Sequence, residues 1–516
     1  MNRNTYMRPD SLVGTCVFYL KLFTKDQKSD IISYILDFDF DAKASGINKT
    51  SQKALSIYGV FMQIVIIGNG SLGDSLIEYI SRENHSIIVI DEDEDVVNAV
   101  VNKYDVRGVC GSGASVDTLR DAGIETADVV ISVAGGDELN LLCCMMAKSL
   151  GAKHTIARVR DPRYLNQQSF MNSSLGVDVI INPEYEAARE AGRLIRFPAA
   201  MKIEKFAQGK VEVVEIHIGK GHPFIDQPLI KFKSKYNTNA LICAAKRGDD
   251  VIIPGGDYVI KEGDSISLVG SRADITELFV KIGLVGKQLH DIMIIGGDST
   301  SRYLAGQLLD GGFKVKIIEQ DGEICNELAE LLPRATVIHG DATDPDLLDD
   351  EGVDAADACV VMTPNDQKNF IISMFAKTRD VDKIIVKQSS KTFVKLASNA
   401  GIDSNVTPGI LVASKVLRYI RGLTGMEDHE NPGQIKSLHK LVDGRVEALE
   451  FDVLEDFECV GMPLRSVKLK KNLIIAAIIR ENAVIYPNGE TALEAGDGVI
   501  VMTTNEQLCD LDDILA

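Results

Sequence analysis

The first clear signal in the sequence is an apolar run that ends in a glycine. Residues 64–67 are all isoleucine or valine, and Gly68 follows them directly. An apolar run without alternation is typical of a strand that is buried on both faces. Beyond the glycine, apolar side chains recur at helical spacing, at Leu72, Leu76, Ile77 and Ile80. The pattern predicts a buried strand, a tight turn and a helix.

Apolar runs and helical segments keep alternating to about residue 195. Further strands are predicted at residues 86–90, 105–110, 129–133, 154–158 and 179–181. Strands that alternate with helices are typical of βαβ units on a parallel sheet. Ligands of such sheets bind beyond the carboxyl ends of the strands. The residues that the sequence places at this edge are Gly68, Asp91, Ser112, Ala134 and Arg158.

After about residue 200 the pattern changes to short strands. Residues 211–218 alternate between polar and apolar side chains, which is typical of a strand with one buried face. More apolar strands follow at residues 241–245, 251–253 and 265–269, separated by turns rich in glycine and aspartate. The sequence therefore predicts a small, strand-rich second domain that extends to about residue 284.

The chain then repeats itself. Gly296 ends an apolar strand equivalent to the one before Gly68, and Glu319 follows Gly296 at the same distance at which Asp91 follows Gly68. In the small domain Arg480 repeats Arg247 at nearly the same offset. Nearly constant offsets along so much of the chain indicate a duplicated two-domain unit. We call each parallel-sheet domain an N-lobe and each small domain a C-lobe.

The predicted fold class is α/β, with a duplicated Rossmann-like parallel sheet and a small α+β domain after each copy. The predicted domains are an N-terminal extension (1–61), a first N-lobe (62–195), a first C-lobe (196–284), a second N-lobe (290–424) and a second C-lobe (435–516). The extension carries eight Lys or Arg and six Asp or Glu, whereas the whole chain has a net charge of −20. Because the fold begins at Met62, we expect residues 1–61 to be dispensable, either because translation starts at Met62 or because the extension is disordered. A functional N-terminal arm is the alternative.

The first glycine turn carries the candidate chemistry. Gly68 permits a sharp turn, Gly70 has no side chain to keep a pyrophosphate away, and Gly73 lets the helix pack closely on the strand. The helix N-terminus offers free N–H groups and a partial positive charge to phosphates. Asp91 ends the next strand, close to the place where an acid that binds ribose hydroxyls is expected. We therefore predict NAD(H) or an adenine nucleotide rather than NADP; the alternative is a turn that binds nothing.

The corresponding turn of the second half departs from this pattern. Asp298 replaces the glycine nearest the pyrophosphate, and Ser301 replaces the third glycine. A carboxylate there repels phosphate and fills the space that phosphate needs. The candidate residues that remain in this half are Gly296, Gly297, Glu319 and Asp341. We expect this second site to be empty or weak, or to hold a less phosphorylated ligand such as a nucleoside.

Composition narrows the possible partners. The net charge of −20 argues against binding to nucleic acid or to anionic lipid surfaces. The longest clean apolar run, residues 473–479, is too short to span a membrane, so we expect no direct membrane insertion. The nine cysteines show no CxxC spacing and the eight histidines no metal-binding pattern, which favours reduced thiols, a cytosolic protein and no bound metal.

The duplicated unit resembles the TrkA family of cytosolic potassium-uptake regulators, whose units are called RCK domains. The resemblance extends from about Met62 to the C-terminus. Its marks are the turn at 68–73, Asp91, Ala127-Asp128, Asp137-Glu138 with Asn140, residues 157–160 with Pro162 and Tyr164, and residues 340–343.

The resemblance implies a cytoplasmic regulatory subunit at the inner face of the plasma membrane. It would gate an integral membrane Trk-type potassium channel or transporter, form a homo-oligomeric ring, and bind NAD(H) and ATP or ADP. Asp91 would hold the ribose, Ala134 and Gly135 would line the base or nicotinamide side, and Arg158 would reach a phosphate. The residues implied to cradle the phosphates are Gly68, Asn69, Gly70, Ser71 and Leu72, with Gly73 completing the turn.

Two alternatives stay open at this stage. The same fold carries NAD-dependent oxidoreductases, but an enzyme also needs a general acid or base placed against its substrate. None of the 13 tyrosines is followed by a lysine at the fourth position, so the common Tyr-x3-Lys pair is missing and we predict that the chain is not an enzyme. The second alternative is an RCK regulator of another cation system that responds to a different ligand.

Overall fold

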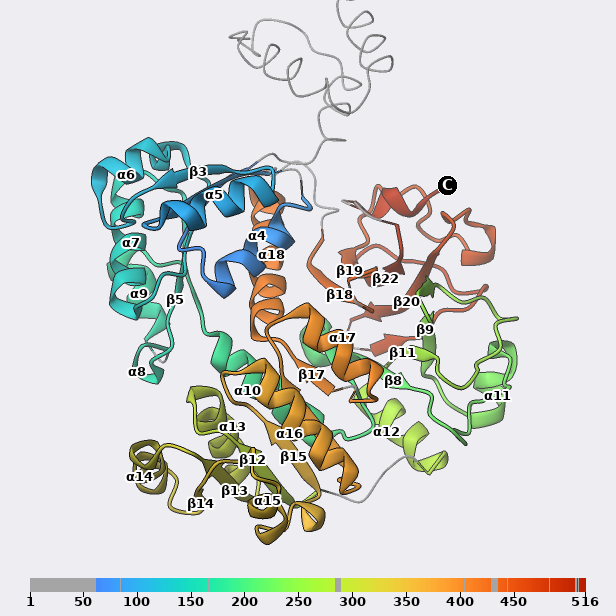
Figure 1. The fold of residues 1–516 in the computed structure, drawn as a ribbon. Helices are drawn as coiled ribbons and strands as arrows, with labels where there is room; N and C mark the ends of the chain where they lie inside the picture. Colours follow the sequence, from blue (N-terminus) through green and yellow to red (C-terminus); the bar gives the residue numbers. More distant parts are fainter. Residues whose placement is uncertain are drawn as a thin grey trace, which may run out of the picture. The chain divides into compact units, whose positions relative to one another are not determined.

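The computed structural model describes residues 62–516 with short gaps. The residues within that range that it leaves out are 84, 166, 284–288, 403, 428–434, 443, 482, 506, 507 and 509. The predicted N-terminal extension, residues 1–61, lies outside the described residues. The expected start of translation at Met62 stays a prediction. Residues Val60–Ala516 form one compact unit (Figure 1).

The first N-lobe is built on a six-stranded parallel sheet. Its strands are β1 (Gln63–Ile67), β2 (Ser86–Asp91), β3 (Arg107–Cys110), β4 (Val129–Ser132), β5 (His154–Arg158) and β6 (Val179–Ile181). They lie in the order β3-β2-β1-β4-β5-β6. Ile67 at the end of β1 pairs with Ile90 on β2 and with Ser132 on β4. The chain changes its winding direction between β1 and β4, which is where such sheets bind ligands.

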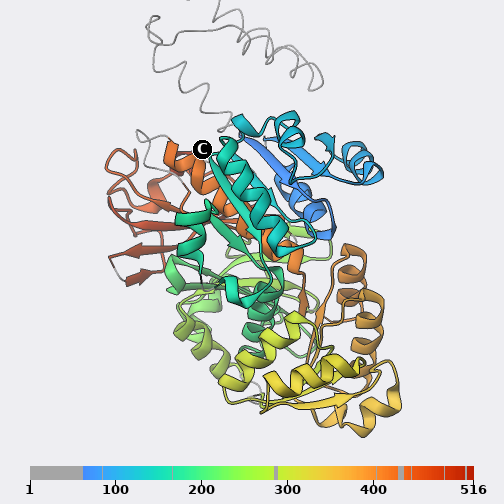
Figure 2. The same cartoon turned by 90° about the vertical axis from the view of Figure 1, so that its left-hand side faces the viewer.

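Helices cover both faces of this sheet (Figure 1 and Figure 2). They are α4 (Ser71–Ile80), α5 (Glu94–Lys103), α6 (Val116–Asp121), α7 (Asp137–Leu150), α8 (Pro162–Leu165) and α9 (Gln168–Leu175). Ile64 of β1 shares a buried cluster with Leu76 of α4, and its neighbour Val65 shares the opposite cluster with Leu119 of α6. Because successive strand residues face opposite sides, burial of both faces explains the unbroken apolar run.

The first C-lobe is an antiparallel sheet. Its strands are β7 (Lys202–Phe206), β8 (Val211–His217), β9 (Leu241–Arg247), β10 (Asp250–Ile252) and β11 (Ser265–Gly270). The order is β10-β9-β11-β8-β7. Two helices accompany it, α11 (Phe232–Tyr236) and α12 (Arg272–Lys281). Strand β7 was not among the predicted strands, because three of its five residues are charged and only Ile203 and Phe206 are buried.

The second N-lobe repeats the first. Its strands are β12 (Asp291–Ile295), β13 (Lys314–Glu319), β14 (Thr336–His339), β15 (Ala358–Val361), β16 (Lys383–Lys387) and β17 (Ser404–Val406). Its helices are α13 (Ser299–Asp310), α14 (Gly322–Leu331), α15 (Pro345–Asp350), α16 (Asp366–Thr378) and α17 (Lys391–Asn399). The strand order β14-β13-β12-β15-β16-β17 is that of the first N-lobe, strand for strand.

The second C-lobe likewise repeats the first. Its strands are β18 (Ser437–Leu441), β19 (Val446–Asp452), β20 (Leu473–Arg480), β21 (Ala483–Ile485) and β22 (Gly498–Thr503), in the order β18-β19-β22-β20-β21. Two parallel sheets, each followed by an antiparallel one, confirm the predicted fold class. The exact domain boundaries stay a prediction.

The last helix of each N-lobe packs on the other half of the chain. These crossover helices are α10 (Pro183–Arg196) and α18 (Pro408–Glu427). Helix α10 lies against α13, where Ala191 and Leu304 share a buried cluster. Helix α18 lies against α4, where Val416 and Leu76 share another (Figure 1). Each half therefore covers the apolar face of the helix that follows the glycine turn of the other half.

The two C-lobes share a buried apolar cluster. Val213 and Ala244 of the first lobe lie in it together with Ala448 and Ala476 of the second. At its rim, the Tyr486 hydroxyl donates a hydrogen bond of 2.7 Å to the carboxylate of Asp274. The halves are thus joined at both the N-lobes and the C-lobes.

Candidate nucleotide site

Two glycines of the first turn are required by close packing. A Cβ on Gly68, whose φ is +94°, would lie 2.8 Å from the backbone nitrogen of Ala134. A Cβ on Gly73 would lie 2.3 Å from the carbonyl oxygen of Gly68. These distances are too short for any side chain, so the turn, the end of β4 and the first turn of α4 fit together only with glycine at both positions.

The middle glycine serves a different purpose. Gly70 is the N-cap of α4 and offers no side chain to cap it, so the first N–H groups of the helix, from Ser71, Leu72 and Gly73, receive no side-chain acceptor from this position. No described atom lies within 4 Å of the place where a Cβ of Gly70 would be. The helix therefore presents its positive end to open space, as an anion site requires.

Asp91 lies directly beside this turn at the end of β2. One carboxylate oxygen accepts a hydrogen bond of 2.7 Å from the N–H of Asn69, and the other accepts one of 3.1 Å from the N–H of Asp93. The side-chain oxygen of Asn69 is buried without a hydrogen-bond partner among the described residues. The predicted ribose-binding acid and the predicted phosphate turn are thus in contact.

Ser112 lies at the same edge of the sheet but makes a local contact. Asp91 pairs with Cys110 on β3, and Ser112 comes just after Cys110 in the chain. Its hydroxyl accepts a hydrogen bond of 3.4 Å from the N–H of Ala114, within the turn that leads to α6. The predicted nucleotide contact of Ser112 therefore remains a prediction.

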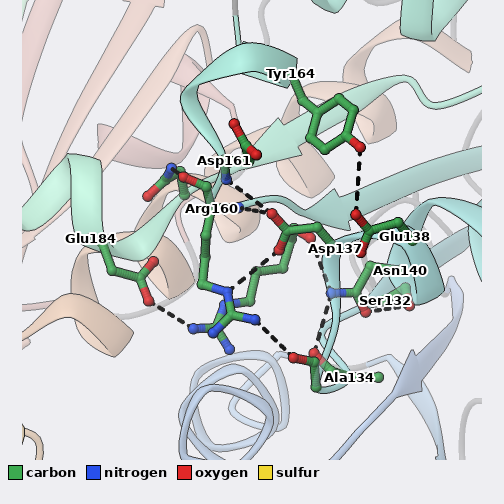
Figure 3. A network of polar contacts seen from close by, with 12 residues as sticks. Ser132, Ala134, Asp137, Glu138, Asn140, Arg160, Asp161, Tyr164 and Glu184 are labelled. Atoms are coloured by element: carbon green, nitrogen blue, oxygen red, sulfur yellow. Dashed lines mark hydrogen bonds and ion pairs between the residues drawn. The ribbon is translucent and has the colours of Figure 1, made fainter. Parts of the chain in front are cut away.

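Ala134 and Gly135 follow β4 and are fixed through their carbonyl groups, as Figure 3 shows for Ala134. Asn140, which is almost fully buried, donates hydrogen bonds to the carbonyl oxygens of Ala134 at 3.2 Å and Arg158 at 3.0 Å. The Arg160 guanidinium donates to the carbonyl oxygen of Gly135 at 2.8 Å. The ends of β4 and β5 are therefore linked behind the glycine turn.

The carboxylate of Asp137 fixes the segment that follows β5. One oxygen of Asp137, the first residue of α7, accepts hydrogen bonds of 2.9 Å from the N–H groups of both Arg160 and Asp161 (Figure 3). In the second half, Asp366 accepts in the same way from the N–H groups of Ser389 and Ser390. The family resemblance marked Asp137 and Asn140 but gave them no role; the structure shows that they hold the strand ends.

Arg158 is held by a residue that the sequence did not indicate. Its guanidinium donates a hydrogen bond of 2.8 Å to Glu184, near the start of α10 (Figure 3). Both side chains are 20% exposed. The Nε of Arg158 and the second carboxylate oxygen of Glu184 are buried without partners among the described residues. This pair therefore retains an unused donor and acceptor beside the site.

The second half places its candidate residues in the same way. Gly296 has a φ of +99°, and the Glu319 carboxylate accepts a hydrogen bond of 2.5 Å from the N–H of Gly297. Asp341, the counterpart of Ser112, accepts hydrogen bonds from the N–H and the hydroxyl of Thr343, and the N–H hydrogen bond lowers the pKa of its carboxyl. The difference lies at Asp298, whose carboxylate accepts a hydrogen bond of 3.0 Å from the N–H of Ser301. The predicted second-half contacts remain predictions.

The sequence predicts that the chain has no bound metal and no membrane span. Across residues 62–516, outside the gaps, no three His, Cys, Asp or Glu side chains are grouped to hold a metal ion. Within the same residues, no helix has the length and apolar character needed to cross a membrane.

Comparison with known proteins divides the chain as its sheets do. The family described as the TrkA-N domain matches residues 64–183 and 292–408. The family described as the TrkA-C domain matches residues 213–283 and 448–516. Each family thus occurs twice, in the order N, C, N, C, which agrees with the duplication inferred from the sequence offsets.

Whole-chain relatives agree with this division. The Trk system potassium uptake protein TrkA homolog of Archaeoglobus fulgidus is 31% identical over 454 residues, which cover 88% of this chain and 100% of the relative. The TrkA protein of Halomonas elongata is 30% identical, and the match covers 86% of this chain and 96% of that relative.

Among solved structures, the GsuK RCK domain aligns with a TM-score of 0.57 at 19% identity, covering 87% of this chain and 93% of that one. The GsuK channel bound to NAD aligns with a TM-score of 0.56 at 19% identity, covering 87% and 77%. These two structures support the fold alone. From the family matches and the whole-chain relatives, the chain belongs to the TrkA family of Trk system potassium uptake proteins, as the sequence resemblance predicted.

Proposed function

We propose that this chain is the nucleotide-binding regulatory subunit of a Trk-type potassium uptake system, and that NAD(H), ATP or ADP bound in the first N-lobe gates an integral membrane potassium channel or transporter. The observation that carries the proposal is the uncapped N-terminus of α4, which opens at Gly70 onto free space beside Asp91. The names of its relatives supply the physiological setting, potassium uptake.

The phosphates would bind at the start of α4. The N–H groups of the first helical turn and the helix dipole together favour an anion at this point. Arg158 stands at the end of β5 with a buried, unpartnered Nε, and could add a charge-assisted hydrogen bond. A phosphate on Arg158 would compete with Glu184 for the guanidinium, so binding would loosen the start of α10.

The ribose would bind at Asp91. Its carboxylate already accepts N–H groups from the turn and from the start of the next helix, so it is fixed in position before a ligand arrives. A carboxylate accepts hydrogen bonds from ribose hydroxyls but repels a 2′-phosphate. This favours NAD(H) and adenine nucleotides over NADP.

One route to the C-lobes runs through α4 itself. Helix α4 packs against α18, and just beyond the C-terminus of α4 Glu83 accepts a hydrogen bond of 2.5 Å from Arg421 on α18. Arg421 also lies 3.6 Å from Glu447 on β19 of the second C-lobe. A displacement of α4 by a bound nucleotide would therefore act directly on α18 and on the second C-lobe.

A second route joins the two N-lobes. The Tyr303 hydroxyl on α13 donates a hydrogen bond of 2.7 Å to the carbonyl oxygen of Arg160, and Asn182 donates to the same oxygen at 3.0 Å. The rings of Tyr303 and Tyr185 pack edge to face with their centroids 5.3 Å apart. Because the Arg160 side chain holds Gly135, a ligand at Gly135 would be sensed by the second half.

A regulatory protein of this kind acts by shifting a conformational equilibrium. A ligand changes that equilibrium only through different affinities for its two states, and coupling of about 1–3 kcal/mol per site is typical. We infer a homo-oligomeric ring, which would multiply the effect of each site. The membrane channel or transporter would dock on this ring and open or close with it, which keeps the chain itself at the cytoplasmic face.

The test compares Asp91→Ala with Glu92→Ala, which removes the same charge from the adjacent, exposed residue. We expect Asp91→Ala to weaken NADH and ATP binding at least about tenfold in calorimetry, because hydrogen bonds to a charged group contribute about 1.5–3 kcal/mol. In cells that lack the chromosomal gene and any second copy, the same variant should lose nucleotide-dependent potassium uptake.

Glu92→Ala should behave as the wild type in both measurements. Normal potassium uptake in the deletion strain, at low and high external potassium, would exclude the proposed function. Unchanged nucleotide affinity in Asp91→Ala would exclude the proposed site.

A further inference from the structure

The second N-lobe supplies its own anion where the first N-lobe is open. Gly70 and Asp298 are equivalent residues of the two repeats, and each is the N-cap of the helix that follows its turn. Gly70 caps nothing, whereas the Asp298 carboxylate accepts a hydrogen bond of 3.0 Å from the N–H of Ser301. A carboxylate at a helix N-terminus meets the same dipole and N–H groups that a phosphate would meet.

The same carboxylate also has a cation. The other oxygen of Asp298 forms an ion pair with the ammonium group of Lys387, the last residue of β16, whose side chain is only 11% exposed. Lys387 occupies the position in the second half that Arg158 occupies at the end of β5 in the first. Both halves thus keep a cation beside the turn, but only in the second half is it neutralised by the turn itself.

The remaining contacts close the second turn further. A Cβ on Gly297 would lie 2.8 Å from side-chain carbons of Ile324 and of Leu328, so the turn is packed against α14. The Glu319 carboxylate accepts the N–H of Gly297, as Asp91 accepts the N–H of Asn69 in the first half. The acid beside the turn and the cation at the end of the fifth strand are therefore retained, while Asp298 occupies the phosphate position itself.

We propose that Asp298 is an internal substitute for the nucleotide phosphate, and that this one residue restricts nucleotide binding to the first half of the chain. Its carboxylate supplies the counter-charge that α13 and Lys387 would otherwise take from a bound nucleotide. The second lobe is therefore held permanently in a ligand-satisfied arrangement. This inference rests on the proposed function in one respect, that the first half binds nucleotide.

The position of α13 indicates what the aspartate at position 298 does for the whole chain. The helix that Asp298 caps is the helix whose Tyr303 donates to the carbonyl oxygen of Arg160 in the first half. A helix whose N-terminus is neutralised from within binds no nucleotide of its own, and it responds to nucleotide only through its contact with the first half. The occupancy of one site, rather than of two, therefore sets the state of the chain.

The experiment counts nucleotide equivalents per chain with the full-length protein, using NADH and ATP as probes in equilibrium dialysis. Wild type should bind one equivalent, and Asp298→Gly should bind two, because it frees both the α13 N-terminus and Lys387. The matched variant Gly70→Asp should bind none, because it builds the second turn into the first half. The double variant Gly70→Asp/Asp298→Gly should bind one equivalent.

Asp298→Ser guards against a variant that fails to fold. Serine is an N-cap without charge, so this variant frees Lys387 and removes the charge that repels phosphate. It should bind a second equivalent, more weakly than Asp298→Gly does, because the hydroxyl still competes for the helix N–H groups. Two equivalents in the wild type would overturn the inference. An unchanged count in folded Asp298→Gly and Asp298→Ser would overturn it as well.

The two proposals fail differently in this assay. If wild type binds none and Asp298→Gly binds one, the site in the first half is refuted and the role of Asp298 is supported. If wild type binds one and the Asp298 variants also bind one, the first site stands and the inference falls.

Discussion

The two glycine turns share one scaffold and differ in whether the chain itself supplies a negative charge at the start of the following helix. Both turns follow the first strand of a six-stranded sheet of the same order, and both place an acid against the N–H of the residue after the first glycine. At Gly70 the helix end is open, whereas at Asp298 it is capped and paired with a lysine. The comparison teaches that, after duplication, a single side chain can turn a binding turn into a structural one without changing the fold around it.

The largest effect on stability is expected where the first turn is tightest. Gly73→Ser copies the residue found at the equivalent position 301, but its Cβ would lie 2.3 Å from the carbonyl oxygen of Gly68. We expect the free energy of unfolding to fall by about 1–3 kcal/mol, as for other overpacked sites. Chemical denaturation of the full chain measures this loss.

Ser301→Ala is the control in the second half. The Ser301 hydroxyl is buried without a hydrogen-bond partner among the described residues, so its removal should leave stability unchanged or raise it. Equal stability of Gly73→Ser and wild type would show that the first turn is no tighter than the second.

A smaller effect is expected at the contact between the lobes. Tyr303→Phe removes the hydrogen bond to the carbonyl oxygen of Arg160, for which no counterpart exists in the first half because the equivalent residue is Ser75. We expect a loss of about 1 kcal/mol in stability. Nucleotide-induced protection of α13 in hydrogen exchange should disappear, while that of α4 persists.

Tyr236→Phe is the matched control for this variant. The Tyr236 hydroxyl donates a hydrogen bond of 2.7 Å to the Pro223 carbonyl oxygen within the first C-lobe. Its removal should cost similar stability without changing exchange in α13. Protection of α13 that survives in Tyr303→Phe would refute the proposed route between the N-lobes.

The smallest effect extends the comparison to the C-lobes. His222 of the first C-lobe and Phe457 of the second occupy corresponding positions in the two repeats. Burial, with His217 adding to it, lowers the pKa of His222 from 6.5 to about 4. The folded state therefore favours the neutral ring, and its contribution to stability is complete above pH 6.5 and is lost as the pH falls from 6.5 towards 4.

We expect His222→Phe to flatten the loss of stability between pH 7 and pH 5. The ring is half-buried, so after allowance for solvent screening the change should be no more than about 1 kcal/mol. Thermal unfolding across this pH range measures the slope, with exposed His290→Gln as the control. A slope equal to that of the wild type would show that His222 is as solvated as an exposed histidine.

Much of the fold could be predicted because its signals are local. The run before Gly68 and the spacing to Asp91 are read within short windows, and they indicated the sheet and the turn. The recurrence of the same local patterns in the second half indicated the duplication. The carboxyl-edge residues were predicted for the same reason, since parallel strands bring their ends together.

The contacts between distant segments could not be predicted. Tyr303 reaches Arg160 because α10 of the first half packs against α13 of the second. Glu184 reaches Arg158 within the first half, because α10 begins near the end of β5. Nothing in a window around any of these residues records these contacts. Asp298 was predicted to repel phosphate, but its pairing with Lys387 depends on the register of β16 and needed the structure.

The exchange of crossover helices affects how the sequences of the two halves can diverge. In a symmetric dimer of identical half-chains, any substitution in the turn would appear in both copies, so losing one site would mean losing both. Here the two halves are joined in one chain and bury the α4 and α13 faces of each other. Fusion therefore allows the two turns to accumulate different substitutions while the exchanged helices keep the halves together. Asp298, at the position equivalent to Gly70, is one such substitution.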